Sequence, residues 1–202
     1  MRTQPRREAT KAANRAAILS AALEAFGELG YGAAGVRDIV RRTDLAAGTF
    51  YNYFPDKESI FRALVEEVSE EAGRRVAQAR ARASTPRGFV EGAYRAYFGY
   101  IVADRRRFEF MRRNAGTIRL LFDDLALPAV TEALMADLRA AIARGDLPEV
   151  DLEYTAHTMI AVGLELGARL VERDPPDVDG ATRFAAGLFL GGLAQTPRMS
   201  RR

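Results

Sequence analysis

One stretch constrains the fold of this chain more than any other, namely residues 30–58. Within it, Val36, Ile39 and Val40 recur at i, i+3 and i+4, which predicts one apolar face of a short helix. A second helix fits residues 47–53, with phenylalanines on one face and small or polar residues on the other. Two short helices this close together predict a helix-turn-helix.

The ends of these two helices are also readable. Asp44 stands between them, and aspartate tolerates the left-handed backbone of a turn better than most residues. Leu45 is predicted to be the buried residue after the turn. Pro55 ends the second helix, because the residue before a proline is kept out of the α region. Asp56 is then the predicted N-cap of the following helix.

The outer face of the second helix carries the strongest functional signal. A helix that serves only stability usually has Glu, Lys or Ala on its wet face. Here that face combines a glycine, which permits close backbone approach, with side chains that can hydrogen-bond phosphates or base edges: Gly48, Thr49, Tyr51 and Asn52. This set favours a recognition helix for the DNA major groove over an ordinary amphipathic helix pair.

This stretch of the sequence resembles the signature of a known protein family. The string LAAGTFYNYFPDKESIF, preceded by VRDI, is similar to the signature of the tetracycline-repressor (TetR) family of bacterial transcription regulators. The resemblance covers residues 14–65, and it extends back through Ile18, Ala22, Phe26 and Gly30. Beyond that segment the chain resembles the family only in length and helical character.

The resemblance implies a role for each matching position. The DNA-binding residues would be Arg37, Thr43, Gly48, Thr49, Tyr51, Asn52, Tyr53 and Lys57. Of these, Tyr53 and Lys57 would hold phosphates, with Arg37 and Thr43 nearby, whereas Phe50 and Phe54 would be structural. The chain departs from the family pattern at Ala34, Gly35 and Ala46, where hydroxyl-bearing residues are missing, and at Asp44, where the family usually has a glycine in the turn.

The net charge is unevenly placed. Residues 1–57 contain nine Lys and Arg against six Asp and Glu, whereas the rest of the chain contains 21 of each. The whole formal excess of +3 therefore lies on the segment with the helix-turn-helix, as expected for a polyanionic partner.

The N-terminal residues complete the predicted DNA-binding domain, 1–56. Residues 1–10 read as a disordered arm, either a solvated tail or a basic arm that follows DNA. A helix is predicted from Thr10 to Leu29, and Gly30 is its C′ residue. It makes a three-helix head.

The remaining segment, 57–202, is predicted to be a helical ligand-binding and dimerisation domain, so the fold class is all-α. A long helix covers residues 57–82, and Pro86 starts the next after a break. The last two helices, 151–173 and 178–194, contain many small residues and are predicted to form the homodimer interface as a four-helix bundle.

Aromatic residues concentrate in the middle of the chain. Eight of the 18 Phe and Tyr residues lie between Phe89 and Phe122. They are either ordinary core residues or the lining of an apolar cavity, and the family resemblance favours the cavity. The predicted ligand-binding residues are Tyr94, Tyr97, Phe98, Phe108, Met111, Phe122 and Met159.

Basic clusters lie beside these aromatics, at residues 105–107 and 112–114. A solvated face explains them most simply. An alternative interpretation is that Arg112, Arg113, Asn114 or Arg119 binds the anionic head of a fatty acyl effector.

Other classes find little support. The chain has no cysteine, its single histidine, His157, has no second metal-binding neighbour, and no Ser lies in a G-x-S-x-G context. We therefore expect no catalytic site, metal or cofactor. No 18-residue apolar run and no signal peptide are present, so we expect a cytoplasmic protein without a membrane partner.

The sequence thus predicts a ligand-responsive transcriptional regulator. It would be a homodimeric repressor that binds a near-palindromic operator and is released by a small, largely apolar effector. The alternatives left open are an activator, a helical adaptor whose head binds protein, and an all-α enzyme.

Overall fold

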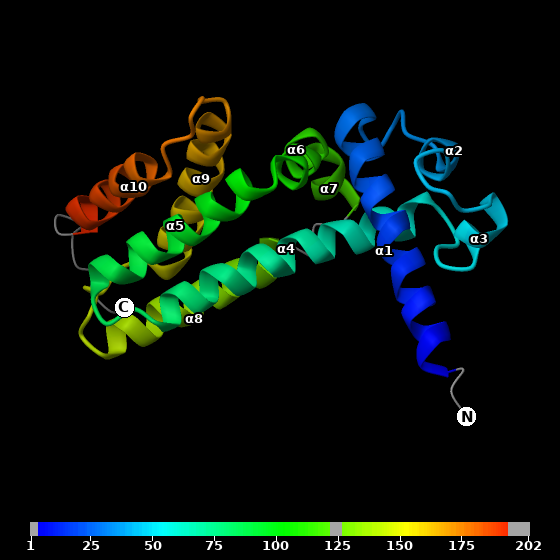
Figure 1. Cartoon of the computed structure of the whole chain (residues 1–202). Coiled ribbons are helices and arrows are strands. Elements are labelled where there is room, and N and C mark those ends of the chain that lie inside the picture. Colours follow the sequence, from blue (N-terminus) through cyan, green and yellow to red (C-terminus); the bar gives the residue numbers. More distant parts are fainter. Residues whose placement is uncertain (1–3, 122–126, 194–202) are drawn as a thin grey trace. The chain divides into compact units, whose positions relative to one another are not determined.

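The computed structural model describes residues 4–121 and 127–193. Within these ranges the secondary structure is helical without strands, which confirms the predicted fold class (Figure 1). The helices in chain order are α1 (Gln4–Leu29), α2 (Val36–Val40), α3 (Ala47–Tyr51), α4 (Lys57–Ala81), α5 (Pro86–Ala103), α6 (Arg105–Arg113), α7 (Ala115–Leu121), α8 (Leu127–Ala143), α9 (Leu152–Val171) and α10 (Val178–Leu193).

The chain divides into two compact units. The first unit contains residues 1–68 and 106–123, and the second contains residues 69–105 and 124–202. The first unit therefore extends beyond the predicted segment 1–56 and includes the first half of α4, most of α6, and α7.

An aromatic cluster explains this larger unit. Phe26 of α1, Phe61 of α4 and Phe110 of α6 are all fully buried. The Phe61 ring lies edge-on to both others, with centroids 5.1 Å from Phe26 and 5.4 Å from Phe110. Burial of such rings is a large hydrophobic contribution, so α6 belongs to the core of the first unit although it is distant in sequence.

Local signals in the sequence set the helix ends of this unit. Gly30 follows α1 with φ at 80°, and its N–H donates to Phe26 O at 3.0 Å, as predicted for a C′ glycine. Asp56 Oδ1 accepts a hydrogen bond from Ser59 N at 2.7 Å, which confirms its predicted capping role and lowers the pKa of its carboxyl.

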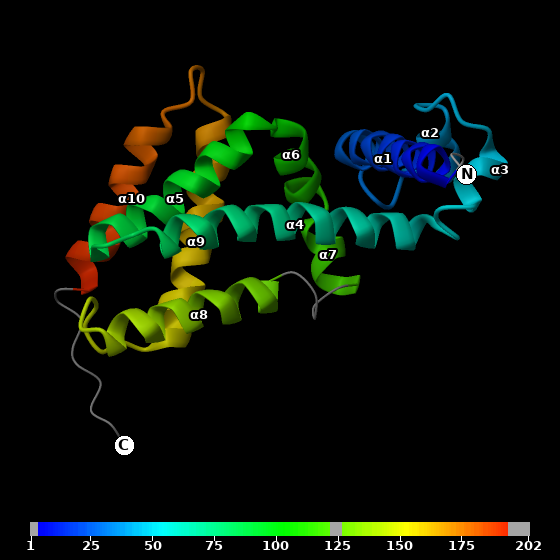
Figure 2. The same ribbon diagram turned by 60° about the horizontal axis from the view of Figure 1, so that its bottom comes forward.

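The predicted disordered arm is wrong for the residues that the structure describes. α1 begins at Gln4 rather than Thr10, so these turns are continuous with the first helix (Figure 2). Residues 8–13, EATKAA, are mostly strong helix formers, and Pro5 lies in the first turn, where proline is tolerated.

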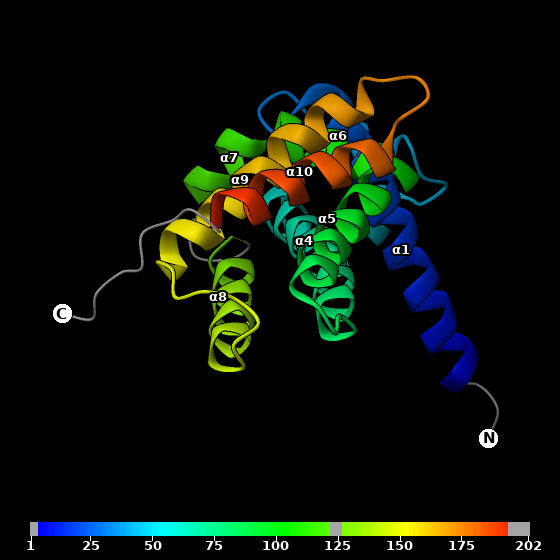
Figure 3. The ribbon, with the colours of Figure 1, turned by 90° about the vertical axis from the view of Figure 1, so that its left-hand side faces the viewer.

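In the second unit, α5 packs against α9 and α10, and α8 packs against α9 (Figure 3). A Cβ atom added at Gly163 would stand 3.5 Å from the Tyr94 ring, and one added at Gly167 would stand 2.8 Å from Ile101 Cδ1. These two glycines therefore allow α9 to approach α5 closely within one protomer, whereas the sequence predicts that the small residues of this segment form the dimer interface. No helix in the described ranges is both long enough and apolar enough to cross a membrane.

Candidate nucleic-acid interface

Helix α3 ends at Tyr51 rather than at residue 53 as predicted, and together with the residues that follow it presents an aromatic face inward and a polar face outward. Phe50 and Phe54 are buried, with ring centroids 6.3 Å apart. Gly48 and Asn52 are exposed, and Tyr51 is 56% exposed although it is a large aromatic residue. The outer face of α3 is therefore available to a partner. Two further predicted residues, Thr49 and Tyr53, are half-buried at its margin.

The turn before α3 is built differently from the prediction. No residue other than glycine has a positive φ in the described part of the chain, so Asp44 is not left-handed. Instead Arg42 N and Thr43 N donate to the carbonyls three residues back, both at 3.0 Å. The Thr43 hydroxyl donates to Val40 O at 2.9 Å and accepts from Leu45 N at 3.3 Å. Thr43 therefore holds the turn, and Leu45 is half-buried rather than fully buried.

Helix α2 starts without a capping hydroxyl, as the sequence indicated. Gly35 has no side chain to complete a capping box, and only the reverse half forms, with Gly35 N donating to Asp38 Oδ2 at 2.9 Å. Arg42 joins the end of α2 to α1 through an ion pair with Glu28 at 2.6 Å. Arg37 is exposed and has no carboxylate partner among the described residues, so its guanidinium can contact a phosphate.

Lys57 clamps the loop between α1 and α2. Its ammonium donates to Tyr31 O at 2.9 Å and to Ala34 O at 3.2 Å, and it lies 4.3 Å from the Tyr31 ring centroid. An ammonium group has three N–H donors, so one remains for a phosphate. The main interaction of Lys57 in this structure is nevertheless with the loop.

Asn114 clamps the same loop from the other side. It is buried, its Oδ1 accepts from Tyr31 N at 2.7 Å, and its Nδ2 donates to Phe26 O at 3.0 Å and Phe110 O at 2.7 Å. The interpretation of Asn114 as a ligand for an anionic head group is therefore wrong, because its amide is fully engaged by the backbone. Sequence analysis missed this role, since two of the three partners lie 83 and 88 residues away.

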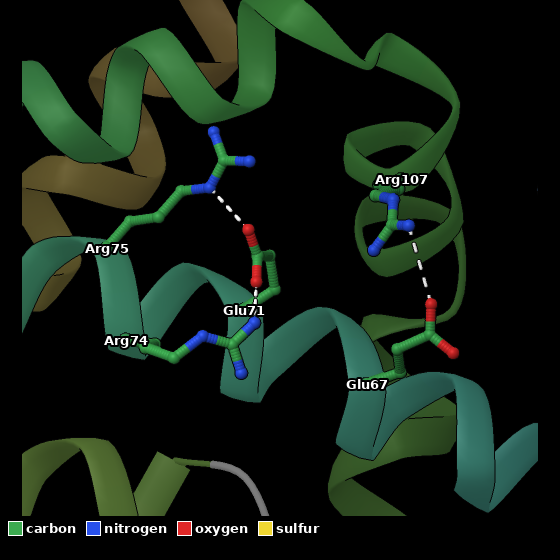
Figure 4. Close-up of polar contacts among 5 residues, drawn as sticks. All are labelled: Glu67, Glu71, Arg74, Arg75 and Arg107. Atoms are coloured by element: carbon green, nitrogen blue, oxygen red, sulfur yellow. Dashed lines mark hydrogen bonds and ion pairs between the residues drawn. The ribbon is translucent and has the colours of Figure 1, made fainter.

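The basic clusters of α6 form ion pairs. Arg106 pairs with Glu24 at 3.3 Å, Arg107 with Glu67 at 3.4 Å, and Arg112 with Glu109 at 2.7 Å. Figure 4 shows the Arg107–Glu67 pair and, separately in the second unit, a carboxylate held by two arginines of α4, namely Glu71 with Arg74 and Arg75. This pairing is typical of a solvated charged surface.

The predicted ligand-binding residues fall into different parts of the molecule. Tyr94, Tyr97, Phe98 and Met159 lie together in the second unit, where the Tyr94 hydroxyl donates to Met159 O at 3.1 Å. The ring of Phe98 stacks on that of Tyr94 with the centroids 5.7 Å apart, and its centroid lies 5.9 Å from that of Tyr97. Burial raises the pKa of both tyrosines, that of Tyr97 to about 12.

The other three candidates do not join this group. Phe108 and Met111 belong to the first unit, because α6 packs into the core beside Phe26. Phe122 lies outside the described residues.

The chain is similar to known transcriptional regulators. Residues 18–64 match the family model described as bacterial regulatory proteins, tetR family. The chain is 27% identical over 192 residues to the HTH-type transcriptional activator FasR of Mycolicibacterium smegmatis, which covers 91% of this chain and 84% of FasR. It is 25% identical over 195 residues to the HTH-type transcriptional regulator UidR of Escherichia coli, covering 89% and 92% of the two chains.

Solved structures with the same fold cover nearly the whole chain. The fatty acid degradation regulator FadR from Bacillus halodurans superposes with a TM-score of 0.77 at 22% identity, covering 89% of this chain and 95% of that one. The transcriptional regulator FadR from Bacillus subtilis, in complex with stearoyl-CoA, also gives a TM-score of 0.77, at 21% identity, covering 87% and 97%.

Proposed function

Because this chain is a TetR-family transcriptional regulator, we propose that it acts as a homodimer that binds a near-palindromic DNA operator and responds to a small, largely apolar effector. The observation that carries the proposal is the outer face of α3, where an exposed glycine, tyrosine and asparagine stand beside one another above a buried aromatic face. That arrangement suits a recognition helix in the major groove.

Base contacts are assigned to the exposed residues of α3 and to its C-cap residue, Asn52. Asn52 and Tyr51 can hydrogen-bond base edges, and Gly48 lets the backbone approach the duplex. Thr49 and Tyr53 lie at the margin, where phosphate contacts are expected. Arg37 supplies a cation without a carboxylate partner in the described ranges. Thr43 and Lys57 would contact phosphates only with the hydrogen-bonding capacity left over from their roles in the turn and loop.

The dimer is assigned to the last two helices. Phe184 and Leu188 are one turn apart on α10 and are 63% and 54% exposed. On α9, Tyr154 and Leu164 are also exposed. Large apolar side chains at such spacing suit a partner helix. A two-fold dimer would offer two α3 helices to successive major grooves about 34–36 Å apart. Phe184→Glu with Leu188→Glu should yield a monomer in sedimentation velocity, whereas a dimer that persists would place the interface elsewhere.

The effector is assigned to the aromatic group of the second unit, around Tyr94, Tyr97, Phe98 and Met159. The relatives support a fatty acyl compound, since the Bacillus subtilis regulator of similar fold was solved with stearoyl-CoA. A thermal-shift series with stearoyl-CoA, stearic acid and an uncharged aromatic tests this. We expect the largest rise in Tm with the acyl compounds, and an equal response to all three would remove the acyl assignment.

We propose repression as the direction of control, with activation as the second candidate, because FasR is described as a transcriptional activator. A reporter fused to the upstream region of the chain's own gene distinguishes them. Deleting the regulator should raise expression under repression and lower it under activation. A protein that acts on the genome would work in the cytoplasm, as the sequence predicts.

Direct DNA binding is tested by fluorescence anisotropy with the upstream region as the probe. We expect the association constant to fall steeply with salt concentration, because phosphate contacts release counterions. A salt-independent interaction, or no binding at all, would favour the protein-binding adaptor.

A further inference from the structure

The first turns of α1 carry a cationic stripe. Arg7, Lys11 and Arg15 follow one another at i, i+4 and i+8, and all three are exposed. Residues four apart in an α-helix lie on the same side, one turn above another. At about 1.5 Å per residue, the stripe extends over about 12 Å of the helix axis.

The stripe lies on the same face of α1 as the residues that pack into the core of the first unit. Ile18 and Ala22 lie on the same helical face, at 100° per residue, and both are fully buried in the first unit. Farther along the stripe, Arg15 Cζ lies 5.5 Å from the ring centroid of Phe54, the buried residue just after α3. The three cations therefore project on the side of α1 that packs against the helix-turn-helix. In Figure 1, α1 continues past α3 toward its N-terminus.

The stripe, like Arg37, lacks carboxylate partners in the described ranges, whereas several other cations of the first unit are paired. Arg42, Arg62 and Arg106 pair with glutamates. In contrast, Arg7 and Lys11 have no carboxylate partner within the part of the chain that the structure describes, and Arg15 contacts an aromatic ring. The stripe carries three positive charges against one neighbouring carboxylate, Glu8, which pairs with none of them in the described ranges, and this net positive charge favours an anionic partner with regularly spaced charges.

We propose that residues 7–15 of α1 form a second DNA-contacting element, which binds the phosphodiester backbone beside the groove that α3 enters. This inference rests on the proposed DNA-binding function. The spacing fits, because a DNA strand presents one phosphate per about 3.4 Å of helix axis and the stripe covers several of them. Because the element is already helical, binding orders no flexible arm. Lysine and arginine on phosphates position a protein without reading sequence, so the stripe contributes affinity rather than specificity.

The test uses the full chain with Arg7→Gln and Lys11→Gln combined, and anisotropy on the upstream duplex and on a scrambled duplex between 50 and 300 mM KCl. Removing two phosphate-binding cations from each protomer should reduce the slope of log K against log salt by about 1.8 per protomer, since each cation on a phosphate contributes about 0.9. Affinity should fall on both duplexes by the same factor, leaving their ratio unchanged. Both side chains are exposed, so circular dichroism should show an intact helical fold.

Two control variants isolate the stripe. Arg139→Gln removes an exposed arginine of α8 that has no carboxylate partner in the described ranges, and it should leave the slope unchanged. Arg7→Lys with Lys11→Arg keeps the charges and should retain the wild-type slope. If the double glutamine variant keeps the wild-type slope, the stripe does not bind DNA. If the wild-type chain itself binds neither duplex, the proposed function fails instead.

Discussion

Replacing Asn114 with alanine should destabilise the first unit more than any other single change to a polar side chain. The three hydrogen bonds of Asn114 do not count equally. Phe26 O keeps a bond from Gly30 N at 3.0 Å, and Phe110 O keeps a bond from the backbone N–H of residue 114 at 3.2 Å. Only the N–H of Tyr31 loses the acceptor that the structure gives it, Asn114 Oδ1 at 2.7 Å.

The magnitude follows from these separate losses. An unsatisfied, partly buried N–H costs about 1–2 kcal/mol, and each of the two carbonyl bonds contributes about 0.5–1.5 kcal/mol. The expected loss is therefore about 3 kcal/mol in the free energy of unfolding. For a chain of this length, that corresponds to a fall in Tm of about 6–12 °C.

Urea denaturation followed by circular dichroism measures the loss, with Asn14→Ala as the matched control. Asn14 lies on α1 and makes no side-chain hydrogen bond to the described residues, so its replacement should cost about 0.5 kcal/mol or less. If Asn114→Ala is as mild as Asn14→Ala, Asn114 does not hold the loop.

Asn114→Asp tests the orientation of the Asn114 amide through the pH dependence of stability. The aspartate would direct a charged oxygen at two carbonyls, so its folded-state pKa would be raised above its unfolded value of about 3.9. The stability of the variant relative to wild type is then highest below the unfolded-state pKa and is lost as pH rises through the folded-state pKa. The variant should be closer to wild type at pH 5 than at pH 8, and a deficit independent of pH would contradict the assigned amide orientation.

Three further predictions test the other assigned roles. Tyr51→Ala and Asn52→Ala should each lose about 1–3 kcal/mol of discrimination between operator and scrambled DNA in competition anisotropy, and equal losses on both duplexes would show that neither reads bases. Lys57→Met should lower the free energy of unfolding by about 1–3 kcal/mol in urea denaturation, because two loop carbonyls lose their ammonium donor, and a neutral result would remove the clamp. Gly167→Val should lower the free energy of unfolding by about 1–3 kcal/mol through overpacking against α5. The control Gly99→Ala adds a methyl group in open space and should raise the free energy of unfolding by up to about 1 kcal/mol. The same change in Tm for both variants would refute the close approach of α9 to α5.

The parts of the fold predicted correctly from sequence depend on neighbouring residues. The Val36, Ile39 and Val40 spacing predicted α2, and Gly30 and Asp56 marked the helix ends because glycine and aspartate act on the backbone within a turn of themselves. The outward face of α3 was readable for the same reason, since Phe50 and Phe54 fix the inward side by periodicity alone.

The parts that were missed depend on distant residues. Nothing local to Asn114 indicates that it accepts a hydrogen bond from Tyr31, and nothing near Phe108 or Met111 indicates that α6 packs beside Phe26 in the first unit rather than among the aromatics of α5. At Thr43 the resemblance implies a DNA contact, and the sequence does not show that the hydroxyl also bonds within the turn. Similarity to a family assigns a position but does not reveal the competing hydrogen bonds there.

The loop between α1 and α2 is held by two residues from later in the chain, Lys57 and Asn114. Lys57 begins α4, which continues into the second unit beyond Val68, and Asn114 follows α6, which the chain enters from the second unit at Arg105. Both clamp the loop at Tyr31, one at its carbonyl and one at its N–H. Under the proposed function, a ligand changes operator affinity only through its differential affinity for two states of the chain. If the loop takes part in that change, Asn114→Ala should weaken the effect of stearoyl-CoA on operator binding, whereas an undiminished ligand response in that variant would show that the signal bypasses the loop.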